Sequence, residues 1–154
     1  PGRAIRTPHY LYIKNYEPDR WPAGDPPLFG DVDAHMLHYP CPTKMFMLEH
    51  RKDPKVKPLF EKAFMKRPAE ELYDLARDPF QMHNVAGKPD YQNIQKRLSA
   101  RLQSYLQQTG DPRVTGGKIL WDTTMYYQPN DFMPKPGEDA IKRLGLKDQY
   151  NYFD

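Results

Sequence analysis

The sequence predicts an α+β fold, in which a small antiparallel β-sheet packs against a long C-terminal amphipathic helix and long Pro-rich loops make the connections. Three observations predict it. Residues 10–15 alternate with a period of two, residues 91–105 carry an apolar stripe at helical spacing, and 17 prolines interrupt the 154-residue chain. Aromatic residues make up 13% of the chain, which argues against wholesale disorder and in favour of a modest core.

The sheet is expected to begin with a hairpin over residues 3–16, whose two strands lie on either side of Pro8. In the second of these strands we expect Leu11 and Ile13 to face the core. A third strand is predicted over residues 70–75, and the turn former Asp78-Pro79 closes it.

Between these strands, residues 17–68 are predicted to form a loop and short helices. The loop spans residues 17–42 and is rich in proline, and we expect the rings of Trp21, Phe29 and Tyr39 to pin it. Short helices are predicted over residues 43–51 and 57–66.

The clearest helix is predicted over residues 89–109, opened by Pro89 and stopped by Gly110. Its apolar stripe comprises Tyr91, Ile94, Leu98, Leu102 and Tyr105. The regular pattern dissolves after Pro112. We therefore predict a folded subdomain over residues 1–112 and an irregular C-terminal extension over residues 113–154, with short regular stretches at most over 119–127 and 140–144.

The overall charge of +3 fits an anionic partner but is equally compatible with an ordinary solvated surface. A basic cluster over residues 52–67 has the same two interpretations. The single cysteine, Cys41, excludes an internal disulfide, and no apolar run is long enough to span a membrane. Because the chain starts at Pro1 rather than Met, we expect it to be a piece of a longer protein.

Two stretches resemble the C-terminal subdomain of sulfatases, in the alkaline-phosphatase superfamily. The more specific one is Glu70-Glu71-Leu72-Tyr73-Asp74-Leu75-Ala76-Arg77-Asp78-Pro79, followed by Asn84-Val85-Ala86. The other is the hairpin Arg3-Ala4-Ile5-Arg6-Thr7-Pro8 with its second strand. The ending Thr109-Gly110-Asp111-Pro112 looks closest to the heparan N-sulfatase (N-sulfoglucosamine sulfohydrolase) branch.

This resemblance implies that the chain is the C-terminal fragment of a sulfatase, docked in the whole protein against a catalytic domain that it lacks. The family uses a formylglycine made from the Cys of C-x-P-x-R and a divalent metal, typically calcium. Cys41-Pro42-Thr43-Lys44-Met45 does not match that motif. We therefore expect no catalytic residue, no metal ligand and no cofactor in this fragment, and an inactive chain in isolation.

A substrate-facing role is assigned to five residues of the long loop, where cations and rings suit a sulfated sugar. They are Arg20, Trp21, His35, His38 and Tyr39. The alternative is that the rings anchor the loop and the histidines are simply exposed.

The function expected from these observations is to complete the substrate cleft of a sulfuric ester or sulfamate hydrolase. Its partners would be the missing N-terminal catalytic domain and a sulfated carbohydrate, with no nucleic acid and no membrane, and an exposed docking surface would favour a homodimer. The parent protein would be periplasmic, secreted or lysosomal. The alternative function is a stand-alone binding module for an anionic polymer, either a glycosaminoglycan or a nucleic acid.

Overall fold

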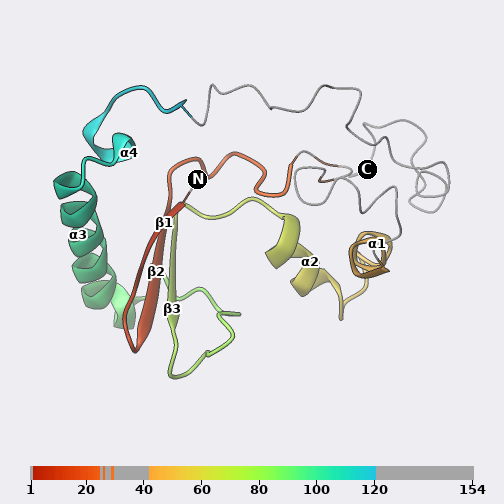
Figure 1. The fold of residues 1–154 in the computed structure, drawn as a ribbon. Helices are drawn as coiled ribbons and strands as arrows, with labels where there is room; N and C mark the ends of the chain where they lie inside the picture. Colours follow the sequence, from red (N-terminus) through yellow and green to blue (C-terminus); the bar gives the residue numbers. More distant parts are fainter. Residues whose placement is uncertain (1, 25, 27–28, 30–41, 121–154) are drawn as a thin grey trace. The chain divides into compact units, whose positions relative to one another are not determined.

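The computed structural model describes residues 2–24, 26, 29 and 42–120 of the chain (Figure 1). Among the described residues, the chain divides into two compact units, one of residues 2–18 and 68–120 and the other of residues 19–24, 26, 29 and 42–67. Each unit has its own hydrophobic cluster. The expected elements at 119–127 and 140–144 lie almost entirely outside the described residues, and the predicted division at residue 112 stays a prediction.

The first unit is built on a three-stranded antiparallel sheet in the order β1-β2-β3. Its strands are β1 (Gly2–Arg6), β2 (Tyr10–Asn15) and β3 (Glu70–Asp74). The hairpin turn is closed by Thr7, whose Oγ1 accepts a hydrogen bond from the Tyr10 amide at 2.9 Å. The predicted hairpin and third strand are therefore confirmed.

The long helix α3 (Gln92–Gln108) covers one face of this sheet, and a 3-10 turn, η2 (Pro89–Tyr91), leads into it (Figure 1). Leu98, Leu102 and Leu106 are buried from the helix side, against Tyr12 and Leu72 of the sheet. Burial of each such leucine stabilises the fold by about 1.5–3 kcal/mol. The α+β architecture predicted from the sequence is confirmed.

The core face of β2 was predicted wrongly. Tyr12 is the fully buried residue of this strand, whereas Leu11 and Ile13 lie on the opposite face of the sheet and are half-buried. Alternation alone did not show that the face of Tyr12 would be buried, because burial of a phenol is favourable only where its hydroxyl finds a hydrogen-bond partner. The Tyr12 hydroxyl has two partners, Glu70 and Ser99, which makes its burial favourable.

The apolar stripe of α3 also differs at its end. Tyr105 is 63% exposed, and Leu106 takes the buried position instead. The buried side chains follow spacings of four residues, so the row that starts at Leu98 reaches Leu106 rather than Tyr105. Tyr105 therefore presents an aromatic ring to solvent.

The end of α3 is fixed by the segment that resembles the family ending. Gly110 has a φ of 70°, and the amide of Asp111 donates to the Leu106 carbonyl at 2.9 Å. Asp111 then caps a last short helix, α4 (Pro112–Thr115), by accepting from the Arg113 amide at 3.0 Å. Arg3 Nε donates to Asp111 Oδ2 at 2.6 Å, so this one carboxylate joins the first strand to the helix end.

Two carboxylates, one at the end of β3 and one beyond it, hold the turn that follows the strand. Asp74 Oδ1 accepts from the amide of Ala76 at 3.2 Å, and Asp78 Oδ2 accepts from the amide of His83 at 2.6 Å. Asn84 then returns to the strand, its Oδ1 accepting from the Leu72 amide at 2.9 Å. These contacts confirm the predicted turn, and both aspartates stabilise it by accepting hydrogen bonds from backbone amides.

The second unit contains α1 (Pro42–Glu49) and α2 (Lys57–Phe64), close to the predicted helices. Its cluster centres on Phe29, which is fully buried and contacts Phe60 and Phe64. The ring of Trp21 packs edge-on against Phe29 with centroids 5.9 Å apart. Rings therefore pin the start of the loop as expected, while Tyr39 lies outside the described residues. Nowhere in the described ranges does a helix have the length and apolar character needed to cross a membrane.

Candidate functional site

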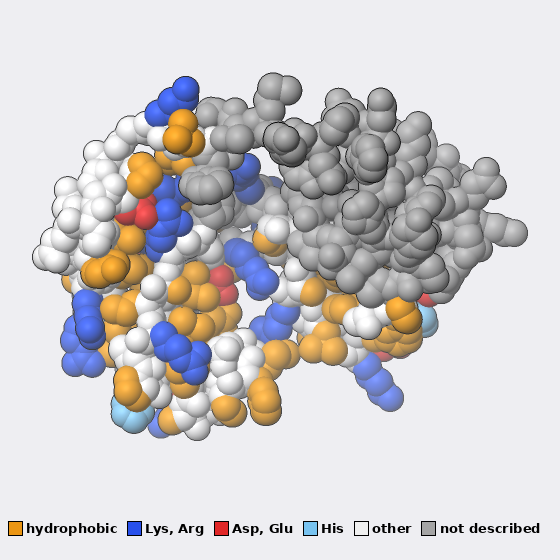
Figure 2. All heavy atoms as spheres, in the orientation of Figure 1, with side chains coloured by type: hydrophobic (Ala, Val, Ile, Leu, Met, Phe, Trp, Pro, Cys, Tyr) orange, Lys and Arg blue, Asp and Glu red, His pale blue; other side chains and the backbone are white. Residues whose placement is uncertain are grey.

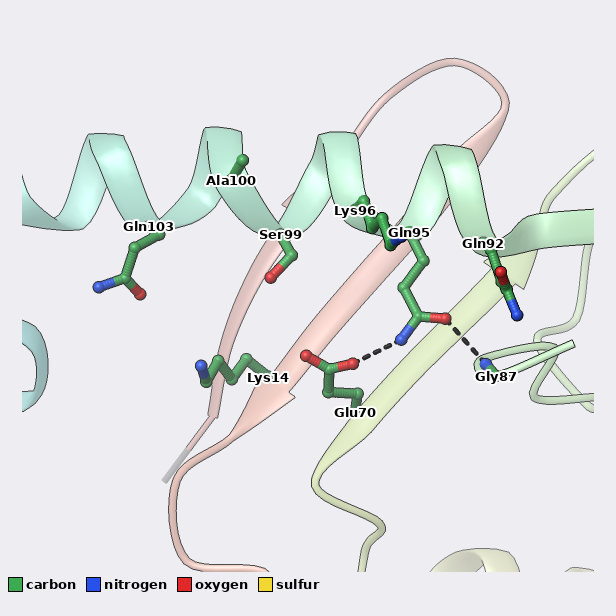
Figure 3. Close-up of a pocket in the computed structure, with 9 residues that line it drawn as sticks. All are labelled: Lys14, Glu70, Gly87, Gln92, Gln95, Lys96, Ser99, Ala100 and Gln103. Atoms are coloured by element: carbon green, nitrogen blue, oxygen red, sulfur yellow. Dashed lines mark hydrogen bonds between the residues drawn. The ribbon is translucent and has the colours of Figure 1, made fainter. Parts of the chain in front are cut away.

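The first unit contains a polar groove of about 650 Å³ between α3 and strands β2 and β3, which we call the α3 groove (Figure 3). Gln95, Ser99 and Gln103 approach it from the helix, and Lys14 and Glu70 from the sheet (Figure 3). Its full lining is Lys14, Glu70, Gly87, Gln92, Gln95, Lys96, Ser99, Ala100 and Gln103.

Glu70 forms part of the lining and is held by the fold. Its Oε1 accepts from the Tyr12 hydroxyl at 2.7 Å, and its Oε2 accepts from Gln95 Nε2. Gln95 in turn accepts from the Gly87 amide at 2.8 Å through Oε1 (Figure 3). Because both carboxylate oxygens already accept from protein donors, Glu70 is poorly placed to act as a general base.

The phenol of Tyr12 is locked in its protonated form at neutral pH. Burial raises the pKa of Tyr12 to about 12, with the neighbouring Glu70 carboxylate acting in the same direction and the Ser99 hydrogen bond acting against it. Tyr12 therefore acts as a steady donor that joins β2 to β3 and α3.

The side chains that remain available in the groove are donors and small polar groups. Lys14 and Lys96 supply two cations, and Gln92 and Gln103 supply amides. Lys14 also lies over the ring of Tyr16, with Nζ 5.6 Å from its centroid. This set can bind a ligand rich in hydroxyl and anionic groups, but it holds no activated nucleophile.

A metal centre is not formed in the described part of the chain, where no three His, Cys, Asp or Glu side chains gather closely enough to hold an ion. The formylglycine motif is also missing from the sequence, as the stretch from Cys41 to Met45 shows. Within the described ranges there is thus no ligand set for a divalent metal, and the stretch around Cys41 is not a formylglycine motif.

Two of the five residues assigned to substrate lie in the described structure. Arg20 is exposed. Trp21 is partly buried in the second cluster, and Lys66 Nζ lies 5.2 Å from its ring centroid. Trp21 thus anchors the loop, as the alternative interpretation expected, and a role in substrate binding stays a prediction for both residues.

The other three residues, His35, His38 and Tyr39, lie outside the described residues, so their role stays a prediction. The residues of the α3 groove were not singled out from the sequence. Glutamines, a serine and lysines at helical spacing read as an ordinary solvated face, and only the tertiary fold sets them opposite Lys14 and Glu70.

No protein-family model matches the chain. Two curated proteins of Formosa agariphila, both named ulvan-active sulfatase, are similar to it. One is 46% identical over 111 residues, which is 72% of this chain and 18% of that protein. The other is 30% identical over 110 residues, 71% of this chain and 17% of that protein. The chain is therefore related to sulfatases, and the match spans less than a fifth of the length of either relative.

Proposed function

We propose that the chain is the C-terminal part of a sulfatase and that it completes the substrate cleft of a catalytic domain outside the chain. The observation that carries the proposal is the 46% identity over 111 residues to a sulfatase several times longer. The strand and turn from Glu70 to Pro79, which resemble the family, form the third strand of the sheet and its closing turn.

The chemistry of sulfate release belongs, in this proposal, to the catalytic domain. That domain would contribute the formylglycine and a divalent metal, typically calcium, which together supply the nucleophile and the Lewis acid. The described residues of this chain offer no set of ligands for the metal. The chain would act by shaping and lining the cleft.

The sheet face opposite α3 suits a docking surface. Leu11 and Ile13 lie on that face, with Tyr73 directly opposite Leu11 in the register. A three-stranded sheet with apolar side chains on both faces is typical of a sheet covered on both sides. We propose that this face meets the catalytic domain, and that the isolated chain forms homodimers through it.

The substrate we propose for the whole protein is a sulfated carbohydrate, with ulvan as the first candidate because both relatives are named for activity on it. Arg20, Trp21, His35, His38 and Tyr39 remain the proposed contacts from the loop. We also propose that the whole protein is exported to the periplasm or the medium, since a polysaccharide substrate lies outside the cell. The alternative is that the whole protein is lysosomal.

A heparan N-sulfatase activity is the second candidate, favoured by the ending Thr109-Gly110-Asp111-Pro112. The visible contacts of this ending are structural: Gly110 ends α3, and Asp111 holds Arg3 and caps α4. They bear on the fold of the subdomain rather than on which sulfated sugar is cleaved, so only assays can separate the two substrates.

The test is sulfate release by the full-length protein, with ulvan and an N-sulfated heparan oligosaccharide as parallel substrates. We expect turnover of ulvan by the full-length protein and none by the 154-residue chain alone. Turnover of the heparan substrate instead would favour the second candidate. A full-length protein that binds either polymer without releasing sulfate would support the alternative of a binding module.

A further inference from the structure

A smaller hollow, of about 260 Å³, lies where β1 meets α3. We call it the arginine pocket, since two arginines line it. Its lining consists of Ala4, Ile5, Arg6, Arg101, Leu102 and Tyr105. It shares no residue with the α3 groove, and neither the resemblance nor the similar proteins assigns it a role.

The first argument concerns charge. Arg6 and Arg101 line one small pocket that contains no acidic residue, and neither makes an ion pair within the described part of the chain. Two other arginines of this unit are paired, Arg3 with Asp111 at 2.6 Å and Arg113 with Glu17 at 3.0 Å. Two cations placed together without a counter-charge favour an anion between them.

The other charged residues of α3 add to the positive charge around the arginine pocket. The charged residues of α3 are Lys96, Arg97 and Arg101, and the helix has no Asp or Glu. On the face drawn in Figure 2, Lys and Arg side chains are prominent over the helix and strands, and Asp and Glu cover only small areas. An anionic ligand is therefore drawn toward this side of the unit.

The second argument concerns shape and apolar surface. The ring of Tyr105 is 63% exposed beside the two arginines, and Ile5 and Leu102 supply apolar surface beneath. Most residues of α3 are exposed, and on this outer face the Tyr105 ring is the aromatic surface that lies beside the two arginines. A flat ring next to guanidinium groups suits a sugar ring that carries an anionic substituent.

We propose that the arginine pocket binds one sulfate-bearing sugar unit of a polysaccharide, with Arg6 and Arg101 on the sulfate and the Tyr105 ring against the sugar. The choice of sulfate rests on the proposed function. A single-stranded nucleic acid is a poorer fit, because such ligands need a run of stacking rings along a basic groove, and this pocket has one ring.

The test is binding of dextran sulfate to the 154-residue chain, measured by isothermal titration calorimetry at fixed salt, with uncharged dextran of equal length beside it. We expect the sulfated polymer to bind and the uncharged polymer not to bind. Arg101→Ala and Tyr105→Ala should each weaken binding about tenfold, the size of one lost charge-assisted or stacking contact. Tyr105→Phe, which keeps the ring, should bind nearly as well as the parent chain.

The matched control is Arg97→Ala, which removes the same charge from the same helix outside the pocket. We expect it to weaken binding less than about twofold, as screening at physiological salt allows. Equal losses for Arg97→Ala and Arg101→Ala would mean diffuse attraction and would overturn the proposal, as would no binding of dextran sulfate. Both helix positions are exposed, and far-UV circular dichroism confirms that each variant is folded.

Competition by an oligo-dT strand that displaces dextran sulfate with the same dependence on Arg101 would also overturn the carbohydrate assignment. The outcome is separable from that of the proposed function. A full-length protein that releases sulfate from ulvan, with a chain that ignores dextran sulfate, refutes the pocket alone. Binding by the chain in a protein without sulfatase activity refutes the proposed function alone.

Discussion

Replacing Tyr12 by Phe tests the hydrogen-bonded link between the sheet and the helix. Tyr12 is fully buried, and its hydroxyl contacts Glu70 Oε1 at 2.7 Å and Ser99 Oγ at 3.1 Å. Phenylalanine keeps the ring and its packing, so the change isolates the hydroxyl. It leaves the Glu70 carboxylate without one of its two side-chain donors.

The expected loss in free energy of unfolding is about 1.5–2 kcal/mol, because a hydrogen bond to a charged group contributes about 1.5–3 kcal/mol and Glu70 is only partly buried. The assay is urea unfolding followed by far-UV circular dichroism. Tyr105→Phe is the matched control, since that residue is 63% exposed, and we expect a change within about 0.5 kcal/mol. Equal effects of the two substitutions would refute the role given to the buried hydroxyl.

The remaining predictions concern pH, packing and association. The native state favours the neutral phenol of Tyr12, so the stability that this residue contributes is present below its ordinary pKa of 10.0 and is lost as pH rises through about 12. Tyr12→Phe should not show this loss of stability at alkaline pH in urea titrations. The Arg3 hydrogen bond lowers the pKa of Asp111, so Asp111→Asn should lower the free energy of unfolding by about 1 kcal/mol at neutral pH. The difference between the two chains, measured by urea unfolding, should vanish as pH falls below 3.8, the ordinary pKa of the carboxyl. Leu106→Ala should lower the free energy of unfolding by about 2–4 kcal/mol in the same assay, and Tyr105→Ala should change it by no more than about 0.5 kcal/mol. A larger loss for Tyr105→Ala than for Leu106→Ala would mean that Tyr105 is the buried residue, as the sequence predicted. The isolated chain should self-associate in light scattering as concentration rises, and a monodisperse monomer would contradict the proposed docking through the face of Leu11 and Ile13.

Apolar periodicity and turn-forming residues were enough to predict the three strands and the long helix of the first unit, but not the short helix α4, which lies where the pattern was expected to become irregular. The strand over residues 10–15, the turn at Asp78-Pro79 and the helix between Pro89 and Gly110 were all found. These signals are local, because a strand, a turn and a helix end each depend on a few neighbouring residues.

The wrong predictions concern residues whose burial is decided by tertiary contacts. Tyr12 rather than Leu11 faces the core because Glu70 and Ser99, distant in sequence, satisfy its hydroxyl. Tyr105 and Leu106 are adjacent on the helix, and only the position of the sheet selects which of them is buried. The α3 groove and the arginine pocket follow from the same docking of helix on sheet, so no local motif could have indicated them.

The central claim is that this chain is part of a sulfatase, and the most direct test is to read the coding sequence upstream of Pro1. We predict an in-frame C-x-P-x-R motif together with acidic residues for a divalent metal site, within a catalytic domain several times longer than this chain. A stop codon or an unrelated domain at that place would contradict the claim, and the subdomain would then act alone as a binding module.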